Sequence, residues 1–199
     1  MQTLPPAAAA ALERLLAGNT RMLAGQPLLP PDSARRSELA EVQTPFAAIL
    51  ACVDSRVIPE LVFHQDIGNL IVARVPGNAL DDDAVAALEF AVVMLGAPLA
   101  FVLGHTGCGA MRIAIDSVHD RRRPPGHLAP ALAPLLPAVK QARGGEGDWL
   151  DNAVAENVRL VVQTLPRRSP LLRAAVEKDA AGIAGGVYDL RTGAVTRLL

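Results

Sequence analysis

Short apolar runs alternate with longer segments of helical spacing along this chain. Three runs, each bounded by glycine, proline or polar residues, are typical of strands buried on both faces of a sheet; they span 46–51, 70–75 and 99–103. Apolar positions spaced three and four apart predict helices, at 6–24, 59–63, 83–95, 111–119, 151–165 and 170–177, with a further short helix starting near Ser33. Because strands alternate with helices, we predict an α/β protein with a central, mainly parallel sheet flanked by helices.

Local signals set the ends of several elements. Asp81 or Asp82 is placed to cap the helix over 83–95, and Pro166 is expected to end the helix that starts at 151. The proline-rich segment 120–139, which includes the solvated Arg121–Arg123 cluster, is expected to form a loop before another helical piece. Residues 185–199 have the pattern of a hairpin with a glycine near its tip, which predicts an antiparallel edge to the sheet.

The first 35 residues are predicted to form an N-terminal helical arm on a single domain that spans 1–199. The helix over 6–24 has one apolar face that needs a partner surface, and a proline-rich link follows it. At 199 residues without an internal repeat, one domain is the expected organisation.

The most apolar stretch, residues 85–104, resembles a membrane span, but Gly96 and Pro98 interrupt it. A buried helix followed by a buried strand is the better interpretation. The segment 1–16 lacks a basic leader before its apolar residues, so we expect no secretory signal and a cytoplasmic location.

Composition narrows the class of partner. Hydrophobic residues make up 51% of the chain and charged residues 20%, an apolar balance that burial between subunits would explain. The net charge of −1 provides no basic field to attract nucleic acid or an anionic membrane. We therefore expect a small-molecule substrate.

The residues with the strongest chemical signal follow two of the predicted strands. Cys52 ends the first strand region, and His105 and Cys108 follow the third. Ligands of open α/β sheets bind beyond the carboxyl ends of strands, so these side chains are expected to meet. Two thiolates and an imidazole suit zinc, and three protein ligands leave a fourth position for water, as in catalytic zinc sites.

Asp54 and Arg56 are spaced to form a charge-assisted pair just past the first strand. In one arrangement Asp54 accepts a hydrogen bond from zinc-bound hydroxide. In the other Asp54 itself ligates zinc and blocks water.

Five segments together resemble the β-class carbonic anhydrases: CVDSR at 52–56, GNLIVARVPGN at 68–78, LEFAV at 88–92, GHTGCGA at 104–110 and YDLRTG at 188–193. The resemblance implies zinc-dependent, reversible hydration of carbon dioxide to bicarbonate and a proton, by attack of zinc-bound hydroxide. It also implies a homodimer or homotetramer, in which N-terminal helices embrace the neighbouring subunit and active sites lie at the subunit interface.

The resemblance assigns roles to individual residues. The zinc ligands would be Cys52, His105 and Cys108, and the catalytic pair would be Asp54 and Arg56. Substrate contacts would fall on Gln43, as a hydrogen-bond donor, and on Ile71, Phe90 and Gly109 of the pocket. Ile49 stands where some relatives carry the tryptophan of a non-catalytic bicarbonate site, so we predict that this inhibitory site is absent, although Arg74 matches a basic residue used in it.

Other interpretations remain open at this stage. The cysteines are compatible with two buried thiols or a disulfide, and the chain with a thiol redox protein, although no C-x-x-C pair is present. A structural or regulatory zinc protein, with Asp54 permanently closing the fourth position, is a further alternative. His64, His119 and His127 are candidate proton shuttles, but ordinary surface or capping roles are favoured for all three.

Overall fold

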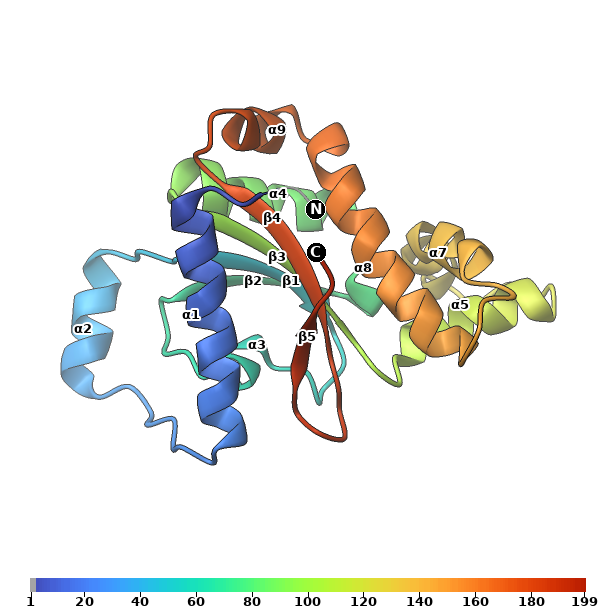
Figure 1. Ribbon diagram of the computed structural model, residues 1–199, viewed down its shortest axis with the longest axis horizontal. Helices are drawn as coiled ribbons and strands as arrows, with labels where there is room; N and C mark the ends of the chain where they lie inside the picture. The colour runs from blue at the N-terminus through green and yellow to red at the C-terminus, as the bar shows by residue number, and fades with distance from the viewer. Residues whose placement is uncertain (1–2) are drawn as a thin grey trace.

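The computed structural model describes residues 3–199 and contains one five-stranded sheet, in the order β2-β1-β3-β4-β5 (Figure 1). The strands are β1 (Ala47–Cys52), β2 (Leu70–Val75), β3 (Leu99–His105), β4 (Gly182–Tyr188) and β5 (Val195–Arg197). The helices of the described residues are α1 (Pro6–Leu23), α2 (Ser33–Glu41), α3 (Pro59–Val62), α4 (Asp82–Glu89), α5 (Gly109–His119), α6 (Leu128–Leu132), α7 (Leu136–Gln141), α8 (Trp149–Arg168) and α9 (Pro170–Glu177). Short 3-10 turns lie at Pro76–Asn78 and Ala133–Leu135, and a π-helical turn at Phe90–Met94.

Strand pairing confirms the predicted α/β class. Strands β2, β1, β3 and β4 are parallel, and β5 pairs antiparallel to β4 across the C-terminal hairpin. The three apolar runs become β1, β2 and β3, and the residues of β1 and β3 are buried throughout. The sheet therefore has a mainly parallel body and an antiparallel C-terminal edge.

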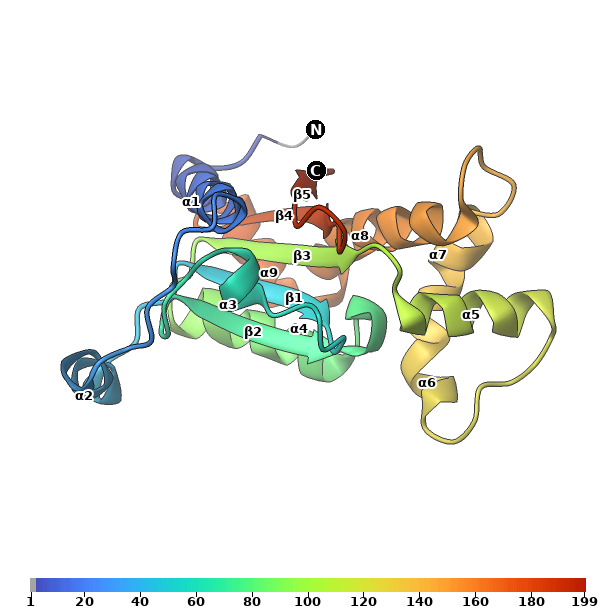
Figure 2. The same cartoon turned by 90° about the horizontal axis from the view of Figure 1, so that it is seen from below.

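Helices cover both faces of the sheet (Figure 2). On one face, α1 and α3 pack over Ile49 and Phe101. On the other face, α4, α8 and α9 pack over Leu50 and Val102. Alternate residues of the same strand thus enter two different cores, as side chains of a strand point alternately to opposite faces.

Helix α8 approaches the sheet closely because glycines lie beneath it. A methyl group added at Gly104 would lie 2.8 Å from Val158 Cγ2, and one added at Gly185 would lie 2.6 Å from Val158 Cγ1. Val158 is fully buried between these two glycine positions. The glycines fix the position of α8 against the strand that ends at His105.

A third group of helices lies beyond the carboxyl ends of the strands, where Figure 2 shows α5, α6 and α7. Their apolar side chains, including Met111, Leu135 and Val139, form a core that also contains Cys52 and Cys108. The two cysteines therefore sit between the sheet and a layer of helices.

Two expectations about proline were wrong. Segment 120–139 is a loop only at its start, since α6 begins at Leu128 and α7 at Leu136. Pro134 and Pro137 occupy first-turn positions, where the missing N–H costs no hydrogen bond. Helix α8 also continues through Pro166 to Arg168, because the packing of its buried face, with Leu165 fully buried, outweighs the loss of one backbone hydrogen bond.

The apolar segment 85–104 folds as a helix and a strand, as predicted. Asp81 caps α4 by accepting a hydrogen bond from the Ala84 N–H, 2.8 Å away, and Gly96 adopts a left-handed conformation before β3. None of the helices in residues 3–199 combines the length and the apolar character that a membrane crossing requires.

The N-terminal segment divides into two parts. Helix α1 packs on the sheet of its own chain and buries Ala8, Leu12 and Leu15. Helix α2 has no buried residue and projects at the periphery of the molecule (Figure 1), where Arg35 pairs with Asp66 of the loop before β2 at 3.1 Å.

Candidate metal centre

Three potential metal ligands converge at the carboxyl ends of two neighbouring strands. Cys52 is the last residue of β1, His105 is the last residue of β3, and Cys108 precedes the first turn of α5. Their ligand atoms all lie within 4.8 Å of one another, and all three residues are buried. Because β1 and β3 pair in parallel, residues 53 positions apart in sequence end at the same edge of the sheet.

The histidine is prepared to act as a ligand through Nε2. His105 Nδ1 lies 2.9 Å from the Thr106 carbonyl oxygen, which only accepts, so Nδ1 carries the proton. The Nε2 atom is buried and has no hydrogen-bond partner within residues 3–199. A buried, unpaired nitrogen beside two sulfur atoms fits a zinc ion, which such a nitrogen would coordinate.

The two thiols are free rather than joined in a disulfide. A hydrogen bond from the Cys108 thiol, helped by the Gly77 N–H at 3.2 Å, lowers the pKa of Cys52 to about 4. The same shared proton and burial raise the pKa of Cys108. The pair thus holds a thiolate beside a protonated thiol. A zinc ion would displace the remaining proton, so that both sulfur atoms bind it as thiolates.

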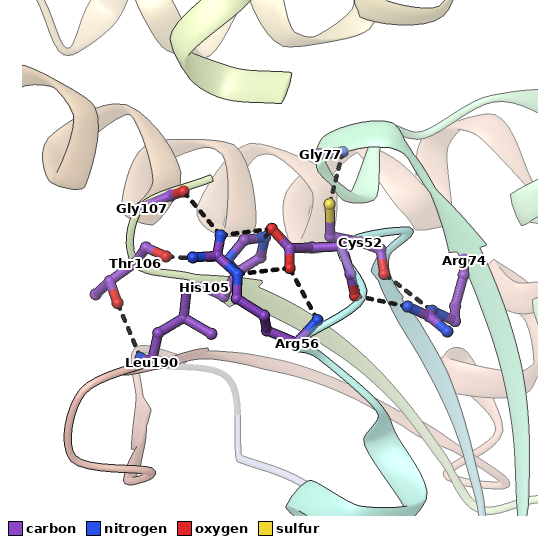
Figure 3. Close-up of polar contacts among 9 residues, drawn as sticks. Cys52, Arg56, Arg74, Gly77, His105, Thr106, Gly107 and Leu190 are labelled. Carbon is purple, nitrogen blue, oxygen red and sulfur yellow. Dashed lines mark hydrogen bonds and ion pairs between the residues drawn. The ribbon is translucent and has the colours of Figure 1, made fainter. Parts of the chain in front are cut away.

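Asp54 and Arg56 form the predicted ion pair, and Figure 3 shows Arg56 beside Cys52 and His105. Arg56 donates from Nε to Asp54 Oδ1 at 2.9 Å and from Nη2 to Oδ2 at 2.7 Å, and its backbone N–H donates to Oδ1 at 3.0 Å. These bonds hold the pKa of the Asp54 carboxyl well below its usual range. Asp54 Oδ2 lies 4.0 Å from His105 Nε2, so the ionised carboxylate faces the metal ligands while Arg56 holds both of its oxygens.

Further contacts fix the loops that carry these groups, and sequence reasoning missed them. Arg74 donates to the carbonyl oxygens of Cys52 and Asp54, at 3.0 and 2.7 Å, and Thr106 Oγ1 accepts from the Leu190 N–H at 3.0 Å (Figure 3). The C-terminal hairpin therefore supports the loop after β3. Backbone partners of this kind leave no local sequence signal, because any residue supplies them.

Comparison with known proteins decides the family. The family model described as carbonic anhydrase matches residues 47–195, from β1 to β5. The β-carbonic anhydrase of Coccomyxa, solved in complex with acetazolamide, is 28% identical and has the same fold, with a TM-score of 0.73 over 84% of this chain and 78% of that one. This chain belongs to the β-carbonic anhydrase family.

Curated relatives agree with this assignment. Carbonic anhydrase 2 of Mycobacterium tuberculosis is 34% identical over 92% of this chain and 89% of its own length. The carbonic anhydrase of Mycolicibacterium smegmatis is 33% identical over 94% of this chain and 91% of its own length. The family is one of lyases that catalyse the zinc-dependent hydration of carbon dioxide, and Cys52, His105 and Cys108 form a buried group in this chain that could hold the metal ion.

Of the pocket residues predicted from the family resemblance, one lies beside the metal ligands. Gly109 directly follows Cys108, is exposed, and begins α5. Ile71 pairs with Ala48 near the amino end of β2, about 13 Å along the strand from Val75, the partner of Cys52.

Gln43 and Phe90 are both exposed at the surface of the chain. Gln43 precedes β1, whose length alone separates Ala47 from Cys52 by about 16 Å, and it lines a surface hollow with Leu39 and Ile67. Phe90 follows α4 and is 47% exposed. The chain therefore does not bring Gln43 beside its own potential metal ligands, and it leaves Phe90 at the surface.

The three histidines outside the metal set have other contacts. His64 accepts from Arg21 Nε at 3.4 Å and lies 3.1 Å from the Gln26 carbonyl oxygen. His119 ends α5 and packs edge-on against Trp149, and His127 is exposed before α6. These contacts are those of surface and helix-end residues in this carbonic anhydrase.

Proposed function

We propose that this chain hydrates carbon dioxide with zinc held by Cys52, His105 and Cys108, and with Asp54 and Arg56 as the catalytic pair. The observation that carries the proposal is the convergence of three soft donors within 4.8 Å, with an unpaired His105 Nε2 among them. Zinc at this position supplies a Lewis acid that brings the pKa of a coordinated water from about 15.7 to near neutrality.

The protein groups then orient the reactants. Asp54 is ionised and cannot donate, so it accepts the hydrogen bond of the attacking hydroxyl group and directs a lone pair of that oxygen toward carbon dioxide. Arg56 keeps the carboxylate in place by binding both of its oxygens. Gly109 leaves the approach beside Cys108 open, because within residues 3–199 no atom beyond its chain neighbours and its own helix backbone lies within 4 Å of the position where a side chain would begin.

The same pair accounts for an inactive state. If Asp54 leaves Arg56, its carboxylate has only a short distance to cover toward the metal ligands, since Oδ2 already lies 4.0 Å from His105 Nε2. Asp54 would then occupy the position that water needs. The alternative function is that of a structural or regulatory zinc protein, in which Asp54 stays permanently in that position. The two hydrogen bonds from Arg56 to the Asp54 carboxylate favour the catalytic function instead.

We further propose a homodimer or homotetramer in which a neighbouring subunit supplies Gln43, Ile71 and Phe90 to the pocket. Support comes from the positions of Gln43 and Ile71 toward the amino ends of β1 and β2, away from Cys52, and from the exposure of Gln43 and Phe90. The exposed helix α2 is the candidate arm for embracing the neighbour. Two β-carbonic anhydrases of Sordaria macrospora that share the fold at 22% identity are tetrameric. Sedimentation of the zinc-loaded protein tests this, and a monomer at micromolar concentration would contradict it.

A cytoplasmic location is also part of the proposal. Two neighbouring free thiols suit a reducing compartment, where they persist as metal ligands rather than as a disulfide.

Stopped-flow hydration of carbon dioxide tests the function. The zinc-loaded protein should show a hydration rate above the buffer background, and dipicolinate treatment should abolish that rate until zinc is restored. Absence of a chelator-sensitive rate up to alkaline pH would remove the enzymatic function and leave the structural alternative.

A further inference from the structure

One contact to the metal ligands comes from the turn that follows β2. The Gly77 N–H donates to Cys52 Sγ at 3.2 Å. Its turn follows β2, which pairs with one side of β1, whereas His105 and Cys108 follow from β3, which pairs with the other side. Figure 3 shows this bond between the Gly77 nitrogen and the Cys52 sulfur. An N–H···S bond neutralises part of the thiolate charge, and its direction depends on the conformation of the turn.

The turn does not hold this conformation by itself. Gly77 and Asn78 are both left-handed, with φ of 66° and 44°, and the second of these is unfavourable for a residue with a side chain. A methyl group at Gly77 would lie 2.6 Å from Leu135 Cδ1, so the turn is also pressed against the neighbouring helices. Such a turn persists only where the surroundings fix it.

Asn157 of α8 is the side chain that fixes it. Its Nδ2 donates to the Gly77 carbonyl oxygen at 3.1 Å, across 80 residues of sequence. Asn157 is 2% exposed and belongs to the buried face of α8, between Val154 and Val158. Burying an amide on an apolar helix face costs free energy unless the amide is hydrogen-bonded. The bond to the Gly77 carbonyl oxygen therefore indicates the role of Asn157.

We propose that Asn157 is a positioning residue of the metal centre, which holds the Gly77 N–H against the Cys52 sulfur. The inference rests on the proposed function, because it takes Cys52 as a metal ligand. Asn157 acts through the backbone of Gly77, whose carbonyl oxygen accepts from Asn157 and whose N–H donates to Cys52. Its removal should let the turn relax, so that the Cys52 thiolate loses its N–H donor and metal binding weakens.

The test compares Asn157→Leu and Asn157→Asp with a matched control, Asn19→Leu. Leucine has nearly the size of asparagine and no donor, and aspartate keeps the shape but places an acceptor toward the Gly77 oxygen. Asn19 is a buried helix asparagine whose Nδ2 also donates to backbone carbonyls, those of Val62 and Gly193, and it lies on α1, away from the metal ligands. Asn19→Leu loses three hydrogen bonds, because Asn19 Oδ1 also accepts from the Val195 N–H, whereas each Asn157 variant loses the one to Gly77. A loss of stability alone would therefore affect the control at least as strongly as the Asn157 variants.

Metal binding does separate them. Zinc affinity, measured by competition with a chromophoric chelator, should fall about 10- to 100-fold in both Asn157 variants and stay unchanged in Asn19→Leu. The Co²⁺–thiolate charge-transfer band of the cobalt-substituted protein should shift in the Asn157 variants only. Either folded variant at position 157 suffices for the comparison.

Two results would overturn the proposal, and they are distinguishable. Wild-type zinc affinity and an unshifted cobalt band in an Asn157 variant would show a merely structural residue, with the metal centre intact. Absence of any cobalt–thiolate band in the unaltered protein would instead defeat the proposed metal centre, and the role of Asn157 with it.

Discussion

Replacing Gly104 with alanine should loosen the packing that holds β3 against α8. The new methyl group would lie 2.8 Å from Val158 Cγ2 and 3.1 Å from Val154 Cγ1, where carbon atoms normally approach to about 3.5–4.0 Å. Val158 has little room to move aside, because its Cγ1 already fills the space over Gly185, where an added methyl group would lie 2.6 Å from it. The helix must therefore shift away from the strand that ends at His105.

We expect Gly104→Ala to lower the free energy of unfolding by about 1–3 kcal/mol, the usual cost of overpacking a core. For a chain of this length each kcal/mol corresponds to about 2–4 °C in Tm. Urea unfolding of the zinc-loaded protein, at one fixed protein concentration, measures the change. Gly145→Ala is the control, since its methyl group would meet its nearest neighbour at 3.4 Å without a left-handed φ, and its effect should be within about 0.5 kcal/mol.

A second substitution tests the stated cause. Val158→Ala alone should destabilise by about 2 kcal/mol through lost methyl burial. In the Gly104→Ala background it also removes the clash, so the double variant should be more stable than the sum of the single effects by about 1 kcal/mol or more. Strict additivity, or a Gly104→Ala protein as stable as the wild type, would refute the packing argument.

Three further predictions concern the site and one of its supporting helices. Asp54→Ala should retain zinc, measured by elemental analysis, but should lose about 100-fold or more in the stopped-flow hydration rate, because the attacking hydroxyl group is no longer oriented; an unchanged rate would defeat the role of Asp54. Zinc binding to the metal-free protein near pH 7 should release about one proton from the cysteine pair, because the lowered pKa of Cys52 leaves it ionised and the raised pKa of Cys108 keeps that thiol protonated. Zinc affinity should accordingly fall as the pH falls. Calorimetry in buffers of different ionisation enthalpy measures the number of protons released, and Cys108→Ser is the control. If this variant released as many protons as the wild type, the released proton would not come from Cys108. Asp81→Ala should cost about 1 kcal/mol in urea unfolding through loss of the α4 cap, whereas Asp83→Ala, at an exposed position in the same turn, should cost less.

Local sequence patterns were sufficient for most of the fold. The apolar runs that became β1 and β2 are short and bounded by turn residues, and the carboxyl-end motifs brought Cys52 and His105 together as the parallel pairing requires. Pro166 shows the limit of such reasoning, because burial of one face of α8 outweighs a local helix breaker.

The surroundings of the site were harder to predict. Gln43 lies at the opposite end of β1 from Cys52, and the sequence of one chain does not show which residues a neighbouring chain would bring to the site. Asn157 did leave a signal, as the one polar residue within the buried stripe of α8, whose other members are Leu150, Ala153, Val154, Val158, Val161 and Leu165. Its partner, the Gly77 carbonyl oxygen, becomes visible only in the fold.

X-ray absorption at the zinc edge of the purified protein tests the central claim most directly. With one zinc ion per chain, we predict two sulfur neighbours at about 2.3 Å, one imidazole nitrogen at about 2.0–2.1 Å and one oxygen neighbour. The sulfur contribution should fall by half in Cys52→Ser. A protein without zinc, or a zinc shell of oxygen and nitrogen only, would contradict the assignment of Cys52, His105 and Cys108 as the metal ligands.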